Sequence, residues 1–553
     1  MARCVCSAAV LAALTACGGG DSGPATSVTP LPPTTRATYT LAGTVTGLSG
    51  SGLVLYVLYT SYLGRAPSSF VNALPVSAAG TFTFGTRVAG DTAYAVLVEA
   101  QPSSPTQYCS VANASGIVAA ANVTNVSVTC GYGYTAGGTA SGLVGSGLEL
   151  QIAAAGYDRA EGVSSPLYID SNGTFTFDLV YPANSSGTFV RINRQPASPT
   201  QRCVIHNAGI VVQAANVTDV EVVCSQFSYV ANAGDNTVSA RTVDATSGAL
   251  AAVGTPVAPG TSPHAIAGTQ DRKYVFVGNE GSNDISAFAV NSASGALTAV
   301  PGSPFAAGTA PKALALLGTY LYVANAGSDT VSAFAVDTST GSLAPLSPAS
   351  FATGKGPSSI AVNGRFIYVA NNGGSNDISA FSVDGTTGIL SPLAGSPVPA
   401  GANPLSLALG ATGKFLYAAN PDATDSSISG FNVDTNSGAL TPLSGSPFPF
   451  AVSHHMATDR TGAYLYVTAG TGVVGYGIDG TTGMLNPLPG FPVATGANAY
   501  SVTVDPTNQF LYVGNDGAGT VSGFELNAAT GGLTPMPGSP FAAGGHPDFI
   551  ATL

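Results

Sequence analysis

A segment of 46 to 49 residues recurs seven times in the C-terminal part of this 553-residue chain. The third copy begins with Tyr-Val-Ala-Asn at Tyr322 and continues to about Leu343. The copies begin at Tyr229, Phe276, Tyr322, Tyr368, Tyr417, Tyr466 and Tyr512. A repeat of this length at a nearly constant period is typical of propellers and solenoids, in which each copy is one structural unit. The repeat therefore constrains the fold more strongly than any local pattern.

Each copy contains four short apolar segments separated by turns rich in Gly, Pro and Asp. In the third copy these segments are 311–316, 320–325, 330–337 and 342–346. Four short strands per repeat form one blade of a β-propeller, so we predict a seven-bladed propeller over 226–553. The first copy lacks its first segment, and the last copy is followed by an extra one that includes Pro547 and Ile550. We predict that this C-terminal strand completes the first blade and removes its free edge.

Two similar segments, 38–131 and 132–225, precede the propeller, and both contain the sequence Gly-Thr-Phe-Thr-Phe. Polar and apolar residues alternate in them, and no helical period is present. We predict two immunoglobulin-like β-sandwich modules, which makes the whole chain all-β. Both carry two cysteines at the same spacing, which predicts the disulfides Cys109–Cys130 and Cys203–Cys224. His206, in the second module, is predicted to lie on the surface.

The N-terminal residues have the features of an export sequence. Residues 1–16 contain a short apolar run and end at Leu-Thr-Ala, directly before Cys17. This resembles the bacterial lipobox, which implies a signal peptide over 1–16, a lipid anchor at Cys17 and a flexible tether over 17–37. Gly18 in that family implies sorting to the outer membrane of the cell envelope. The alternative is an ordinary signal peptide with a cysteine there by chance.

The composition excludes some classes of partner. The chain has 16 basic and 28 acidic residues, and its net charge of -12 disfavours nucleic acid, which requires clustered Lys and Arg. The sequence contains no Cys-x-x-Cys pair, P-loop or zinc motif, so we predict neither a cofactor nor a metal. The expected partners are the membrane, through Cys17, and a carbohydrate, peptide or protein ligand.

The repeat resembles a known family. The sequences Tyr-Val-Ala-Asn at 322–325 and Tyr-Val-Gly-Asn at 512–515, with turns of the type Asp-x-x-x-Gly-x-Leu, are similar to the YVTN-repeat propellers. They also resemble the wider lactonase-type seven-bladed family, which includes 6-phosphogluconolactonases and carboxymuconate cyclases. The resemblance covers 226–553 and implies the fold. It is a weaker guide to activity, because one fold carries many functions.

The candidate site lies where the innermost strand of each blade begins. The residues after the Pro at that point, or its equivalent, are His264, Lys312, Ser358, Leu405, His454, Tyr500 and Asp548. The four histidines of the propeller all fall in this region, since His455 and His546 are the other two. Histidine is suited to proton transfer near neutral pH. We predict that Lys312, His454, Tyr500, His546 and Asp548 bind a ligand. The alternative is that these polar residues only solvate the mouth of the channel.

The lactonase resemblance adds possible catalytic residues. Glu280 matches a glutamate that follows the strand-end Asn in that family, and His455 matches the histidine of its Pro-Arg-His motif. His454 stands where the arginine would be, and a phosphorylated sugar requires cations that this face largely lacks. The leading hypothesis is a binding or scaffold role. The alternative is hydrolysis of an unphosphorylated lactone or similar cyclic ester, with His455 or His264 as general base and Glu280 assisting.

Overall fold

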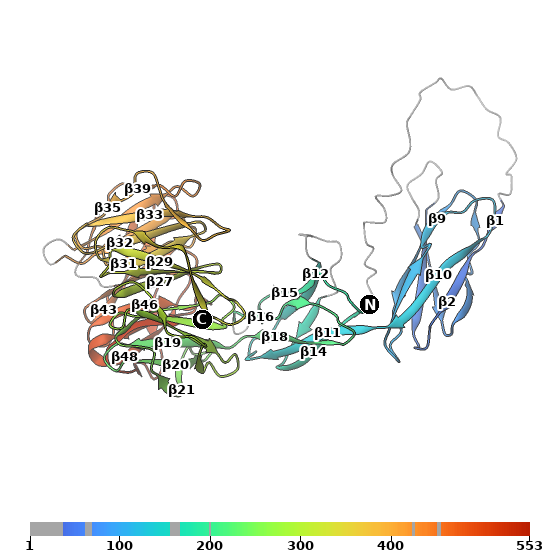
Figure 1. The fold of residues 1–553 in the computed structure, drawn as a ribbon, viewed down its shortest axis with the longest axis horizontal. Coiled ribbons are helices and arrows are strands. Elements are labelled where there is room, and N and C mark those ends of the chain that lie inside the picture. Colours follow the sequence, from blue (N-terminus) through green and yellow to red (C-terminus); the bar gives the residue numbers. More distant parts are fainter. Residues whose placement is uncertain (1–36, 61–68, 155–165, 198–200, 423–425, 451–454) are drawn as a thin grey trace, which may run out of the picture. The chain divides into compact units, whose positions relative to one another are not determined.

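The computed structural model describes residues 37–60, 69–154, 166–197, 201–422, 426–450 and 455–553 (Figure 1). Cys17 and His454 lie outside these residues. The fold is all-β, as predicted, with a three-residue 3-10 helix at Asp516–Ala518. Within the described residues, no helix has the length and apolar character needed to cross a membrane. The chain forms two compact units, and the larger one contains Val223–Leu553 together with Ser141–Ser146 and Gln195–Val204.

The first module consists of two four-stranded sheets that share one core. The strand orders are β5(Gly80–Thr83)-β2(Leu41–Thr46)-β10(Val123–Tyr132)-β8(Gln107–Ala112) and β4(Ser69–Val76)-β3(Leu53–Thr60)-β7(Ala93–Ala100)-β9(Ser115–Ile117), and β1(Thr38–Tyr39) pairs with β6(Val88–Ala89). Val45 and Val128 from one sheet and Val57 and Val96 from the other are buried in the same core. The alternating pattern of apolar residues therefore places one face of each sheet inward.

The second module repeats this arrangement. Its sheets are β14(Gly173–Tyr181)-β11(Tyr134–Ser141)-β18(Val217–Val223)-β16(Val204–His206) and β13(Leu167–Ile169)-β12(Leu148–Ala154)-β15(Thr188–Arg194)-β17(Gly209–Ile210). Both predicted disulfides are confirmed. The prediction of a surface position for His206 is wrong, because the residue is buried and its Nδ1 lies 3.0 Å from Oε2 of Glu221. The predicted disulfide Cys203–Cys224 already ties the two strands together, and the antiparallel register that pairs these cysteines also brings His206 opposite Glu221. The surface prediction did not use this register.

The propeller has seven blades, coloured green to red in Figure 1, each built from four principal strands. From inner to outer strand, the first blade is β51(Pro547–Thr552)-β19(Gln226–Asn232)-β20(Thr237–Val243)-β21(Leu250–Val257), the second is β22(Pro263–Gly268)-β23(Tyr274–Asn279)-β24(Asp284–Val290)-β25(Leu297–Ala299), and the third is β27(Pro311–Leu317)-β28(Tyr320–Asn325)-β29(Thr330–Val336)-β30(Leu343–Ala352). The fourth blade is β31(Pro357–Asn363)-β32(Phe366–Asn371)-β33(Asp377–Val383)-β34(Leu390–Pro392), and the fifth is β36(Ser406–Leu409)-β37(Phe415–Asn420)-β38(Ser427–Val433)-β39(Leu440–Pro442). The sixth blade is β41(Met456–Thr458)-β42(Tyr464–Ala469)-β43(Gly472–Ile478)-β44(Leu485–Pro487), and the seventh is β46(Ala499–Val504)-β47(Phe510–Asn515)-β48(Thr520–Leu526)-β49(Leu533–Pro535). Five blades add a short outer segment: β26(Phe305–Ala306), β35(Val398–Pro399), β40(Phe448–Pro449), β45(Val493–Ala494) and β50(Phe541–Ala542).

The ring is closed by the C-terminal strand, as the repeat predicted. β51 pairs antiparallel with β19, so that Ile550 lies opposite Val230 and Thr552 opposite Ser228. The C-terminus accordingly lies beside β19 in Figure 1. β51 also contacts β46 on one side and β22 on the other, which joins the seventh blade to the second around the channel. The first blade therefore combines segments from both ends of the propeller sequence.

The repeated Tyr and Asn residues have distinct structural roles. The Tyr417 side chain is fully buried, and its hydroxyl donates a hydrogen bond of 2.7 Å to the carbonyl of Gly483 in the next blade. Six blades form this bond, through Tyr229, Tyr322, Tyr368, Tyr417, Tyr466 and Tyr512. Asn325 is also buried, and its amide donates to Oγ of Ser332 across the turn at 2.9 Å. The tyrosine links adjacent blades, whereas the asparagine holds the turn within one blade.

Candidate functional site

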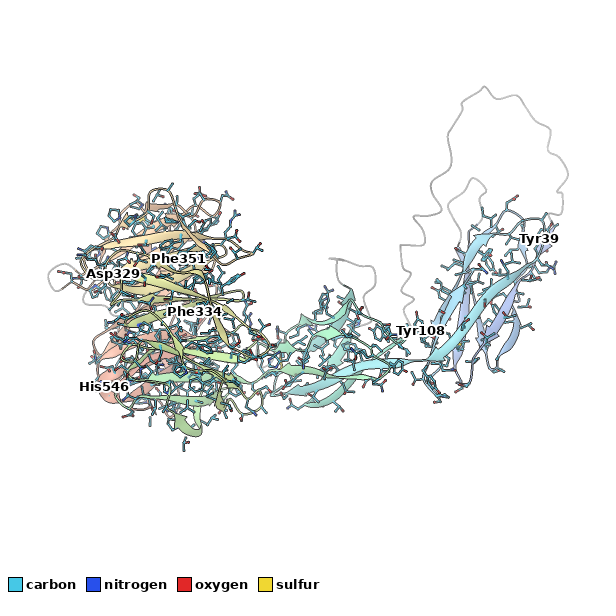
Figure 2. The ribbon with its side chains drawn as sticks, in the orientation of Figure 1. Tyr39, Tyr108, Asp329, Phe334, Phe351 and His546 are labelled. Atoms are coloured by element: carbon cyan, nitrogen blue, oxygen red, sulfur yellow. A yellow bond between two sulfur atoms is a disulfide. The ribbon has the colours of Figure 1, made fainter. Side chains whose placement is uncertain are left out.

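The candidate site lies on the face of the propeller at which the innermost strands begin, which we call the top face. The turn between the second and third strands of one blade adjoins the start of the next blade's inner strand there. Asp329, in such a turn, accepts a hydrogen bond of 2.8 Å from the backbone N–H of Gly356, directly before β31. Figure 2 labels Asp329 and His546 on this same side of the propeller. Residues from several blades therefore come together on the top face.

A β-bulge at the start of the inner strand positions the site residues. In the second blade, Pro263 pairs with Asn279 and Ala265 pairs with Gly278, so His264 has no partner residue between them. The same shift occurs at the residues that follow the strand start in four other blades, namely Lys312, Ser358, Tyr500 and Asp548. A bulge leaves its extra residue outside the ladder and changes the direction of its side chain. In these five blades the side chain at this position is therefore not constrained by a cross-strand partner.

Four ionisable residues from three adjacent blades form a line in which acidic and basic side chains alternate. His264 Nδ1 lies 3.1 Å from Oδ2 of Asp548 and 3.8 Å from Oε2 of Glu280. Lys312 Nζ lies 3.3 Å from Oε1 of Glu280. The His264 side chain is only 12% exposed, and those of the other three are partly buried. A carboxylate can only accept, so Nδ1 of His264 donates to Asp548 and the lone pair of the neutral ring lies on Nε2.

Aromatic rings lie beside this line of ionisable residues. The Tyr500 ring centroid is 6.1 Å from that of His264 and 4.8 Å from that of His455. The Phe549 ring is 6.4 Å from the His455 ring. Burial raises the pKa of Tyr500 far above its usual value, and the nearby carboxylates of Asp548, Glu280 and Asp516 raise it further. The Tyr500 phenol is therefore neutral near pH 7.

His455 is oriented by the backbone of the neighbouring blade. Its Nδ1 lies 3.0 Å from the carbonyl oxygen of Tyr500, which can only accept, so Nδ1 carries a proton. The His455 backbone N–H donates to Oγ1 of Thr468 at 3.0 Å, and that hydroxyl also lies 3.0 Å from the Tyr500 carbonyl. These contacts attach His455 to the Tyr500 strand, and they bring both predicted catalytic histidines next to the same tyrosine.

His546 belongs to a different group. It precedes β51 with a positive φ of 52°, its side chain is 64% exposed, and its Nδ1 lies 2.8 Å from Oδ1 of Asp516. The Asn498 amide donates to the other Asp516 oxygen at 2.6 Å. The structure thus places His546 with Asp516 and Asn498, not with His264. In the portion of the chain that the structure describes, no three His, Cys, Asp or Glu residues could hold a metal ion.

Two residues of the top face were not selected from the sequence. Asp516 follows the strand-end Asn515, as Glu280 follows Asn279, so a search for any acidic residue at this position, and not only for the family's glutamate, would have found it. Phe549 stands where the inner strands of the second and third blades have alanine, at Ala265 and Ala313. Comparing each inner-strand position across the seven repeats would have identified it.

Comparisons with known proteins agree with this architecture. The sequence matches the family described as Lactonase, 7-bladed beta-propeller, over residues 179–312 and 318–453. The propeller belongs to the lactonase family. This confirms the resemblance given by the Tyr-Val-Ala-Asn repeats. The match begins within the second module and ends before the sixth blade, whereas the lactonase-type propeller of the structure comprises β19 to β51.

Solved structures show the same fold. A candidate 6-phosphogluconolactonase from Bacteroides uniformis aligns with a TM-score of 0.53 and 17% identity, over 60% of this chain and 99% of that chain. A second, from Bacteroides fragilis, aligns with a TM-score of 0.51 and 19% identity, over 60% of this chain and 98% of that one. A search of curated proteins finds no match. At these identities the likeness establishes the fold alone.

Proposed function

We propose that the top face of the lactonase-type propeller binds an uncharged, hydroxyl-bearing small molecule of the sugar or sugar-lactone class. The observation that carries this proposal is the grouping of Glu280 and Asp548 around His264 beside the Tyr500 ring. Carboxylates accept hydrogen bonds from hydroxyl groups, and an aromatic ring offers an apolar surface. A phosphate would meet two carboxylates there, while the Lys312 ammonium is already paired with Glu280.

Hydrolysis of an unphosphorylated lactone is the second candidate, and the His264–Asp548 contact favours it. With Nδ1 donating to Asp548, Nε2 of His264 can take a proton from water as that water attacks the lactone carbonyl carbon. The C–O bond of the ring then breaks, and its oxygen receives the proton from the imidazolium to give the open hydroxy acid. Asp548 holds the ring and stabilises its charged form. His455, whose ring also lies beside that of Tyr500, is the alternative base.

One set of measurements tests both proposals. The full chain is titrated calorimetrically with unphosphorylated sugar lactones and their phosphorylated counterparts, and acid release is followed in parallel. We expect the neutral compounds to bind, the phosphorylated ones to bind about tenfold or more weakly, and the H264A/H455A double variant to lose acid release. Lys414→Ala, which changes an exposed turn residue outside the cluster, serves as the control.

Each result of this test has a separate meaning. Binding without acid release would support the binding role and remove the hydrolytic one. Acid release that persists in the H264A/H455A variant would exclude both histidines as the general base. Equal binding of the phosphorylated and neutral compounds would contradict the assignment of an uncharged ligand.

We further propose that the chain is exported and lipid-anchored at Cys17, in the bacterial outer membrane. The disulfides Cys109–Cys130 and Cys203–Cys224 support this, because such bonds persist in oxidising compartments outside the cytoplasm.

Replacing the predicted anchor residue tests this localisation. Cys17→Ser is expected to move the protein from the membrane fraction to the soluble fraction and to abolish incorporation of labelled fatty acid. Cys6→Ser, the same change within the predicted signal peptide, is the matched control and is expected to alter neither result. Fatty acid that is still incorporated after Cys17→Ser would contradict the assignment of Cys17 as the anchor.

A further inference from the structure

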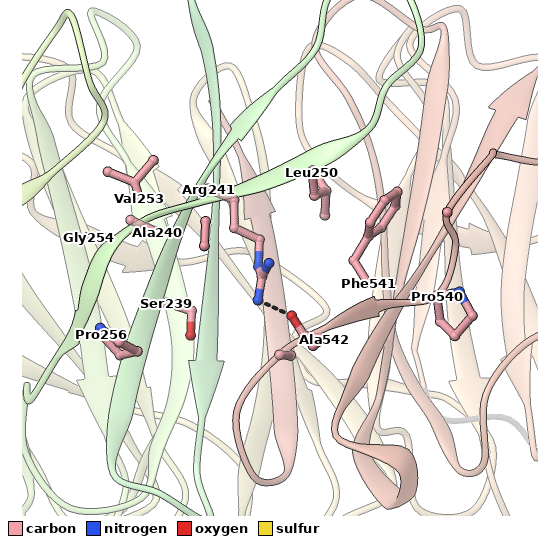
Figure 3. Close-up of a pocket in the computed structure, with 13 residues that line it drawn as sticks. Ser239, Ala240, Arg241, Leu250, Val253, Gly254, Pro256, Pro540, Phe541 and Ala542 are labelled. Carbon is pink, nitrogen blue, oxygen red and sulfur yellow. Dashed lines mark hydrogen bonds between the residues drawn. The ribbon is translucent and has the colours of Figure 1, made fainter.

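A cavity of about 470 Å³ lies at the outer part of the seam between the seventh and first blades, away from the inner strands. Strands β20 and β21 line one side, and the segment from Gly538 to Ala543 lines the other. Figure 3 shows the Arg241 guanidinium directed toward the carbonyl of Ala542, with Phe541 and Leu250 nearby. Among the described residues that line the cavity, Arg241 is the one that carries a charge.

Arg241 breaks the repeat at a position that is otherwise aromatic. The equivalent residues of the other six blades are Phe288, Phe334, Phe381, Phe431, Tyr476 and Phe524, all buried. Each of these rings packs in the core between its blade and the preceding one. The first blade has a cation in place of a ring, and the cavity lies beside it. The departure is confined to the seam at which the ring closes.

The residues paired with Arg241 are polar as well. Ser228 lies opposite Arg241 on β19, and Thr552 lies opposite Ser228 on β51, so the three side chains share one face of the sheet. The positions equivalent to Ser228 are fully buried aliphatic residues: Val275, Leu321, Ile367, Leu416, Leu465 and Leu511. The first blade thus replaces an apolar row with a polar one.

This polar row is incompletely hydrogen-bonded. Nε of Arg241, Oγ of Ser228 and Oγ1 of Thr552 are buried without a hydrogen-bond partner among the described residues. Arg241 is 8% exposed, and its hydrogen bond to the Ala542 carbonyl supplies no negative charge. Burial lowers the pKa of Arg241, and no carboxylate in the described part of the chain counteracts this shift. A buried guanidinium without a counter-charge is costly, and such groups in native structures call for an explanation.

We propose that the cavity binds a small organic monocarboxylate with a short apolar body, through the Arg241 guanidinium. A carboxylate is the counter-charge that the site lacks, and its planar group matches the fork of the guanidinium. The apolar body would contact Leu250, Val253 and Phe541, which line the cavity. This site is separate from the top face. Its proposed ligand is an anion, whereas the proposed ligand of the top face is an uncharged molecule.

The test uses hexanoate as the probe and hexanamide, its uncharged counterpart of similar shape, as the control ligand. Binding to the full chain is measured by calorimetric titration and by the shift of the thermal unfolding midpoint. Hexanoate is expected to bind wild-type protein and hexanamide to bind about 10- to 100-fold more weakly, which is the effect of losing a hydrogen bond to a charged group. Equal binding of the two ligands would overturn the proposal.

Two variants of Arg241 locate the site. Arg241→Phe restores the aromatic residue of the other blades, and Arg241→Met keeps an unbranched side chain without the charge. Both are expected to lose hexanoate binding while the unfolding midpoint without ligand stays the same or rises. Retained binding in a folded variant would overturn the proposal. The proposal would also be overturned if wild-type protein did not bind hexanoate and both variants had a lower unfolding midpoint. Arg241 would then only join the two blades through its hydrogen bond to Ala542.

The top-face histidines provide the matched control. The H264A/H455A variant removes two groups that could bind a carboxylate elsewhere, and it is expected to bind hexanoate as wild-type protein does. Loss of hexanoate binding in this variant, with binding retained in Arg241→Phe, would assign the carboxylate to the top face and overturn the seam site.

Discussion

A chain that ends at His546, and therefore lacks β51, is expected to lose the cooperative unfolding transition of the propeller. β51 is the innermost strand of the first blade, and it pairs with β19 and contacts β46 and β22. Its removal leaves the backbone groups of β19 unpaired along the channel and uncovers Val230, which is fully buried in the intact protein. Burial of one side chain such as Ile550 contributes about 1.5–3 kcal/mol. Together these losses approach the stability of a typical domain, about 5–15 kcal/mol.

Differential scanning calorimetry and near-UV circular dichroism of the full and shortened chains would measure this effect. Deletion of 26–32, seven residues of the segment predicted to be a tether, is the control of equal length and is expected to leave the transition unchanged. A shortened chain that unfolds cooperatively within a few degrees of the intact protein would show that the ring does not depend on its C-terminal strand.

The second large effect is expected at the tyrosines that join adjacent blades. Tyr417→Ala removes a fully buried ring from the core between the fifth and sixth blades, together with the hydrogen bond to Gly483. Replacing a large buried aromatic residue by alanine costs about 3–5 kcal/mol, because the cavity only partly collapses. The free energy of unfolding, measured in urea, should fall by this amount.

Tyr417→Phe separates packing from hydrogen bonding. It keeps the ring and removes only the hydroxyl, so the expected loss is about 0.5–1.5 kcal/mol. The second blade already has a phenylalanine, Phe276, at the equivalent position, where it is fully buried. If Tyr417→Phe cost as much as Tyr417→Ala, the hydrogen bond rather than the packing of the ring would dominate the contact between these blades.

Much of the fold followed from the sequence because the information is local and repeated. One copy, such as 322–343, contains the apolar residues of its strands and the turn residues between them. The same pattern of strands and turns recurs in all seven copies, so each copy supports the same assignment. The half-blades at the two ends predicted closure, and the equal spacing of cysteines predicted both disulfides. The environment of His206 was missed because the predicted disulfide Cys203–Cys224 was not extended along the two strands to the pair His206 and Glu221.

The sequence by itself determined that residues 226–553 form a closed ring of seven four-stranded blades, and it marked the residues that depart from the repeat. The tertiary structure alone decided which of these residues meet. His264 and Asp548 are 284 residues apart, and Arg241 and Ala542 are 301 apart, yet both pairs are in contact. Closure of the ring brings the two ends of the repeat array together, and the bulge at each strand start directs the site residues. Neither effect is visible in a single repeat, because both depend on pairing between strands that are distant in the chain.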